Sequence, residues 1–248
     1  MTAQTFLDLY RELKLRHYKT QDLELIFHAH ELATRIFSGS YRPTYKPFIC
    51  HLVGTASVLG KCGERRELIA AAILHSAYPL GAFGDRMRDL TKQKRRVVSQ
   101  CVGAEAEAIV YQYCIADWSS FERLDGEVGN PQGVERDLLA LKLADLFDDI
   151  SDNTMKIVPK KGMVMDSSRN ATFRAKVVEC ASRTLGRSIA KEFESLFDEI
   201  EREDIDDFLI NQRTSSFFEH RKPLTFFSRL SPRSYFGSRS TISTPAAV

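Results

Sequence analysis

Residues 72–81 read AILHSAYPLG, an apolar run that ends in a histidine, a serine, a tyrosine and a proline. The run belongs to a longer segment, Glu67–Tyr78, that is apolar nearly all round at helical spacing, which predicts a helix at the centre of the fold. Pro79 and Gly81 are expected to break the chain after it. His75 is therefore expected to lie inside the protein, either as a hydrogen-bonded core residue or as a ligand at a site.

The other segments also repeat their apolar residues with helical period, and almost none alternates as a strand would. The 248 residues suffice to bury a sizeable core. The sequence therefore predicts an all-α domain over residues 1–212. Helices are expected at 6–15 with Thr5 as the cap, at 21–37 with Thr20 as the cap, and at 47–59, 86–100, 104–116, 134–151, 166–187 and 189–210. A long loop at 118–133 is expected to cover a cleft.

The C-terminal segment differs in composition from the rest of the chain. From about Arg213 the residues are mainly Ser, Thr, Arg, Phe and Pro without helical period, which predicts a disordered tail over residues 213–248. The tail carries six basic residues and one acidic one, so its charge is +5 and that of the preceding residues is −3. A mildly acidic body gives no general reason to bind nucleic acid. The aromatic residues of the tail suggest docking onto a protein partner, and the alternative is a tail without a role.

The cysteine content and hydropathy bear on location. The five cysteines form no closely spaced pair, and their number is odd, as is typical of reduced thiols in a cytoplasmic protein. No run approaches 18 apolar residues, so no transmembrane segment is expected. The opening MTAQTFLDLYREL contains acidic residues and no apolar core, so it does not resemble a secretory signal.

Three polar residues interrupt otherwise apolar helices: His51, His75 and Asp145. Asp145 lies off the main apolar face of its helix, yet it shares its side with further leucines, so we expect it to be buried. A buried carboxylate is costly unless it is paired, hydrogen-bonded or bound to a metal. Two histidines and a carboxylate are sufficient protein ligands for Zn²⁺ or Fe²⁺. The spacing alone leaves open whether these residues bind a metal or form a hydrogen-bonded core cluster.

The tracts around these residues resemble those of the HD-domain superfamily of helical metal-dependent phosphohydrolases. KPFICH ends at His51, AAILHS ends at Ser76, and KLAD ends at Asp145, in the order found in the (p)ppGpp hydrolases of that superfamily. The resemblance implies an HD-domain-like helical bundle. It also implies a divalent metal ion (Mn, Fe or Zn) held by His51, His75 and Asp145, and a small substrate that is phosphorylated or otherwise anionic.

The departures from the superfamily pattern are equally specific. Ser76 replaces its metal-binding aspartate, and Pro79 and Leu80 replace an acidic pair, so hydrolysis of (p)ppGpp does not carry over. The chain is more similar to an uncharacterised HD-like group with an H-x-x-G-T tract, here HLVGT at 51–55, and a downstream L-H-S-x-Y tract ending at Tyr78. Ser76 and Tyr78 are the residues expected to orient substrate or water.

Three functions are compatible with these patterns. The first is a metal-binding enzyme, a hydrolase of a small phosphorylated or other anionic metabolite. The second is a non-catalytic ligand-binding, regulatory or scaffold protein that keeps the HD-like fold and uses residues 213–248 to dock a partner. The third is an iron-dependent oxygenase, because two histidines and a carboxylate also suit Fe²⁺.

Overall fold

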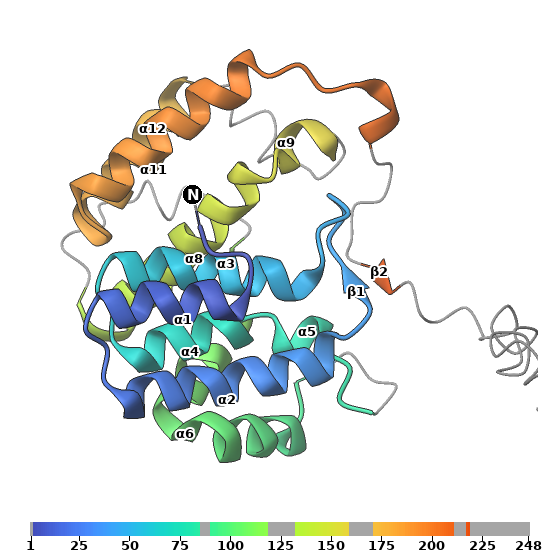
Figure 1. Ribbon diagram of the computed structural model, residues 1–248, viewed down its shortest axis with the longest axis vertical. Coiled ribbons are helices and arrows are strands. Elements are labelled where there is room, and N and C mark those ends of the chain that lie inside the picture. Colours follow the sequence, from blue (N-terminus) through green and yellow to red (C-terminus); the bar gives the residue numbers. More distant parts are fainter. Residues whose placement is uncertain (1, 85–89, 119–131, 159–170, 211–216, 219–248) are drawn as a thin grey trace, which may run out of the picture. The chain divides into compact units, whose positions relative to one another are not determined.

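The computed structural model describes residues 2–84, 90–118, 132–158, 171–210 and 217–218, and the protein is all-α, as the sequence predicts (Figure 1). The described helices belong to one unit that ends at Phe217. The elements are α1 (Phe6–Leu15), α2 (Thr20–Phe37), β1 (Ser40–Tyr41), α3 (Phe48–Lys61), α4 (Arg66–Leu74), α5 (Ala77–Leu80), α6 (Lys92–Ile115), α8 (Gly133–Ser151), α9 (Thr154–Ile157), α11 (Ala171–Thr184), α12 (Arg187–Arg202), the 3₁₀ turn η1 (Asp207–Leu209) and β2 (Phe217–Phe218).

The first two helices begin close to the predicted residues, with one difference in capping. Thr5 caps α1 as expected, because its hydroxyl accepts a hydrogen bond from the Asp8 amide at 3.2 Å. Helix α2 instead begins at the threonine that was expected to cap it. The Asp22 carboxylate satisfies the preceding amide of Lys19 at 2.9 Å, so the cap lies one residue earlier than predicted.

Helix α4 lies at the centre of the bundle, as its apolar sequence predicts. All seven residues from Leu68 to Leu74 are fully buried, and the helix packs against α2, α3 and α6. The predicted helix through Tyr78 is interrupted, however, because α4 ends at Leu74 and the short helix α5 follows. Pro79 lies inside α5 and does not break the chain. Proline is tolerated there because the first amides of a helix have no intrahelical partner.

Helix α3 lies between α4 and α8 and contacts both. It is buried along most of its length, which explains its apolar and small side chains. This packing brings the first turn of α3, the C-terminal end of α4 and the middle of α8 into one region of the interior, where His51, His75 and Asp145 lie close together.

Several other predictions differ from the structure at helix ends. The helices expected at 86–100 and 104–116 are joined in α6 across a break at Gly103, whose φ of 81° is unfavourable for residues with a side chain. Helix α12 ends at Arg202, eight residues before the predicted end, and is followed by η1. Part of the predicted helix at 166–187, most of the loop at 118–133 and nearly all of the tail at 213–248 lie outside the described residues.

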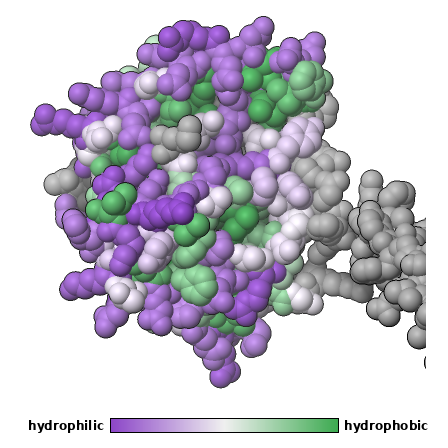
Figure 2. Space-filling view, in the orientation of Figure 1, coloured by the Kyte–Doolittle hydropathy of each residue, from purple (hydrophilic) through white to green (hydrophobic). Residues whose placement is uncertain are grey.

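Hydrophilic side chains dominate the face shown in Figure 2, with hydrophobic ones in scattered patches, as expected when amphipathic helices turn their apolar faces inward. None of the described helices combines the length and the apolar character needed to cross a bilayer.

Candidate metal centre

His51 lies in the first turn of α3 and is completely buried. Its Nδ1 is 2.9 Å from a carboxylate oxygen of Asp148 on α8. Burial would favour the neutral form of Asp148, but hydrogen bonds and charge from His51 and Lys46 hold the pKa of Asp148 below its usual range. An ionised carboxylate can only accept, so the hydrogen in this bond is on Nδ1 of His51.

His75 directly follows α4, where its Nδ1 donates to the carbonyl oxygen of Ala72 at 2.7 Å. Burial lowers the pKa of His75 to about 4, against the opposing influence of the Asp145 carboxylate. The ring is therefore neutral at pH 7, and its Nε2 carries a lone pair.

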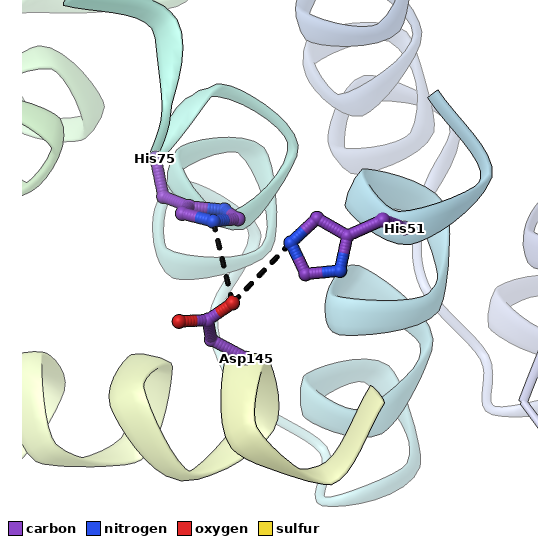
Figure 3. A group of neighbouring side chains, drawn as sticks. All are labelled: His51, His75 and Asp145. Carbon is purple, nitrogen blue, oxygen red and sulfur yellow. Dashed lines mark ion pairs between the residues drawn. The ribbon is translucent and has the colours of Figure 1, made fainter. Parts of the chain in front are cut away.

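Asp145 projects from α8 toward both rings, and its two oxygens have different partners. Oδ2 accepts from the hydroxyl of Tyr113 at 2.9 Å and from Nζ of Lys142 at 3.2 Å. Oδ1 lies 3.3 Å from Nε2 of His51 and 3.6 Å from Nε2 of His75 (Figure 3). Burial opposes ionisation of Asp145, but the nearby positive charge of Lys142 is the largest of the influences that hold the pKa of Asp145 well below its usual range.

These three groups turn atoms that attract a cation toward one another, and no hydrogen bond joins those atoms. His51 Nε2 is buried without a hydrogen bond, although Asp145 Oδ1 is nearby. One ligand atom from each of His51, His75 and Asp145 lies within 4.8 Å of the others. Three atoms that bind one ion at about 2.0–2.2 Å lie slightly closer together than this. A small inward movement of the three side chains would therefore be enough to bind an ion. The donor set and its spacing therefore fit a divalent transition-metal ion.

The groups behind the ligands are also those expected at a metal site. Each ligand has its remaining polar atom fixed: His51 by Asp148, His75 by a main-chain carbonyl, and Asp145 by Tyr113 and Lys142. Such outer hydrogen bonds fix the tautomer and orientation of histidine ligands. The sequence predicted that His51, His75 and Asp145 converge, and the structure brings them together.

The two other predicted residues have different positions. Ser76 follows His75 at the start of α5, is 9% exposed, and makes no side-chain capping bond. The hydroxyl of Tyr78 donates to Glu107 at 2.7 Å, and Arg95 donates to the same carboxylate. The tyrosine that contacts the cluster is Tyr113 on α6.

Three residues that contact the cluster are not predicted from the sequence: Tyr113, Lys142 and Asp148. Lys142 and Asp148 each lie three residues from Asp145 on α8, so helical spacing alone places them beside it. Tyr113 comes from another helix, 32 residues away in sequence, and no local pattern marks it.

The comparisons with known proteins locate a family only over part of the chain. Residues 38–118 match the model of a domain of unknown function, DUF6817. This segment contains His51, His75 and Tyr113 but ends before α8, which supplies Asp145. No protein with a curated description matches the sequence.

Proposed function

We propose that this protein is a metal-dependent hydrolase related to the HD-domain superfamily, acting on a small phosphorylated or otherwise anionic metabolite. The observation that carries the proposal is the buried Nε2 of His51, which lacks a hydrogen bond and faces an ionised oxygen of Asp145. His75 Nε2 faces the same oxygen. Three neighbouring acceptors without a shared proton are a costly arrangement, and a cation between them would remove that cost.

In this proposal His51, His75 and Asp145 hold one Mn, Fe or Zn ion and leave coordination positions open. A divalent ion bound there supplies Lewis-acid activation of water. The superfamily resemblance of the three tracts supports the assignment of hydrolysis, and the five free cysteines support a cytoplasmic location.

Lys142 is the residue that we assign to the anionic substrate. Its ammonium group lies 3.2 Å from Asp145 Oδ2, and its side chain is 22% exposed, compared with 13% for Asp145. The ammonium group also lies 5.5 Å from the centre of the Trp118 ring, whose indole nitrogen donates to the carbonyl oxygen of Tyr113. A positive charge thus lies beside the candidate metal site, where a phosphoryl group would bind. Ser76 remains our candidate for orienting substrate or water.

A second function is a non-catalytic ligand-binding protein on the same scaffold. Ser76 favours it, because this residue stands where the superfamily has a metal-binding aspartate and a hydroxyl is a weaker ligand. In this case residues 213–248 are assigned to docking a protein partner.

The experiment that distinguishes the two is a hydrolysis assay on protein loaded separately with Mn²⁺, Fe²⁺ and Zn²⁺. The substrates are p-nitrophenyl phosphate, bis-p-nitrophenyl phosphate and nucleoside mono-, di- and triphosphates. The matched variants are His75→Gln and His28→Gln; His28 is a histidine with a half-exposed side chain that pairs with Glu31 and does not belong to the cluster.

We expect metal-dependent turnover of at least one substrate, lost in His75→Gln and kept in His28→Gln. Metal binding without turnover of any substrate would support the non-catalytic function. Turnover that survives His75→Gln would contradict the assignment of the site.

A further inference from the structure

The HLVGT tract contains a glycine inside a buried helix, where it costs about 1 kcal/mol relative to alanine. Gly54 lies one turn after His51 on α3. A Cβ atom added at Gly54 would lie 1.9 Å from Oδ1 of Asp148 and 2.7 Å from its Cγ. No side chain fits in that space, so the glycine allows the Asp148 carboxylate to lie against the backbone of α3.

The carboxylate of Asp148 is fully buried and contacts both Lys46 and His51. Nζ of Lys46 lies 3.0 Å and 2.9 Å from its two oxygens, and His51 Nδ1 lies 2.9 Å from Oδ2. The same lysine also donates to Asp152 at 3.0 Å. The carboxylate is thereby held in one orientation, and Lys46 compensates for the burial of its charge.

We propose that Asp148, held by Lys46 and accommodated by Gly54, is the positioning residue of His51: it fixes the ring with hydrogen on Nδ1 and the Nε2 lone pair toward Asp145 Oδ1. This inference rests on the metal site of the proposed function. Asp148 acts through His51 and does not itself face the ion.

The two histidines differ in a way that makes this proposal testable. His75 is oriented by the main-chain carbonyl of Ala72, which no substitution removes. His51 is oriented by a side chain that can be changed. The proposal therefore predicts that changes at Asp148 or Gly54 alter His51 and leave the hydrogen bond of His75 intact.

The first measurement is ¹⁵N NMR of the imidazole nitrogens in metal-free protein at pH 7.5. We expect His51 to carry its hydrogen on Nδ1 in the wild type, and to lose this preference in Asp148→Ala. Asp148→Asn keeps an oxygen that can accept from Nδ1, so this variant should restore the preference at least in part. A wild-type His51 with its hydrogen on Nε2 would overturn the proposal whether or not a metal binds.

The second measurement is a Co²⁺ titration followed by visible absorption. We expect Asp148→Ala and Gly54→Ala to bind Co²⁺ about 10- to 100-fold more weakly than the wild type. The matched control is Gly60→Ala on the same helix, where the added Cβ would meet the flexible end of Leu13, 2.7 Å away, and not a group at the site. Its affinity should equal that of the wild type.

The outcomes of the titration separate this inference from the proposed function. Equal Co²⁺ affinity in wild type, Gly54→Ala and Asp148→Ala, all three folded by circular dichroism, would overturn the positioning role while the metal site stands. A wild type that does not bind Co²⁺ would instead overturn the metal site, and with it the inference.

Discussion

Two groups of buried polar residues lie in this helical bundle, and they differ in how their hydrogen bonds are satisfied. In the first group, Tyr78 donates to Glu107 at 2.7 Å, and Arg95 donates to both oxygens of Glu107 at 2.6 Å and 2.8 Å. Every contact joins a donor to an acceptor. In the second group, His51, His75 and Asp145 turn acceptor atoms toward one another.

The difference separates a structural network from a candidate site. Buried polar groups in stable proteins are nearly always hydrogen-bonded, so the pairing in the Tyr78 network needs no further explanation. The cluster at His51 leaves a buried nitrogen without a partner while fixing every atom behind the ligands. Such an arrangement is expected where a ligand completes the bonding.

The largest effect that the comparison predicts is a dependence of stability on pH. The pKa of His75 is about 4 in the folded protein, against 6.5 ordinarily. Between these values the unfolded chain binds a proton that folded His75 does not, so stability is lost as pH falls from about 6.5 to about 4, by up to about 3 kcal/mol. Urea unfolding of chelator-treated protein at pH 7.5 and pH 5 measures this loss.

The control for this effect is His75→Gln, because other groups also titrate below pH 6. The variant should lose less stability than the wild type between the two pH values. Equal losses in the two proteins would show that His75 is not held neutral by burial.

The next effect compares the central carboxyl groups of the two networks. Glu107→Gln removes the charge that Arg95 and Tyr78 surround, so we expect it to cost about 2 kcal/mol of unfolding free energy. Asp145→Asn should cost less than about 1 kcal/mol of unfolding free energy in metal-free protein. In the wild type an acceptor oxygen of Asp145 faces the Nε2 atoms of both imidazoles, whereas the amide of the variant can donate a hydrogen bond to one of them. Urea unfolding of metal-free proteins would contradict the comparison if Asp145→Asn were the more destabilising.

The smallest effect compares the two tyrosines. Tyr78→Phe should cost about 1 kcal/mol of stability and leave Co²⁺ affinity unchanged, because Glu107 keeps Arg95. Tyr113→Phe removes one of the two hydrogen bonds on Asp145 Oδ2 and should weaken Co²⁺ binding by about 10-fold. A Co²⁺ titration in which Tyr78→Phe has the larger effect would reverse the assignment of the two networks.

The sequence predicts the helices and the burial of three polar residues because both depend on local periodicity, whereas the expectation that these residues meet comes from the HD-domain resemblance and from the cost of a buried unpaired carboxylate. The apolar surroundings of His51, His75 and Asp145 were visible in the chain, and so was the central position of α4. The sequence suggests a site role for Tyr78 because this residue follows Ser76 closely, at the end of the L-H-S-x-Y tract. That spacing does not place it there, because α4 ends at Leu74 and a new short helix begins.

The residues that the sequence did not reveal come from contacts between helices. The proximity of Gly54 to Asp148 depends on how closely α3 approaches α8, and neither helix specifies that distance by itself. The partner of Asp145 on α6, Tyr113, likewise depends on packing. Periodicity indicates which face of a helix is buried, but it does not indicate which residue of another helix will meet that face.

The proposed function requires that His51, His75 and Asp145 hold one metal ion together. The decisive measurement is elemental analysis of wild-type protein and of the Asp145→Ala variant, both purified without chelators and then dialysed against Mn²⁺, Fe²⁺ or Zn²⁺. We expect about one equivalent of one of these metals in the wild type and less than about 0.1 equivalent in the variant. Less than about 0.1 equivalent of every metal in the wild type, or equal content in both proteins, would contradict it.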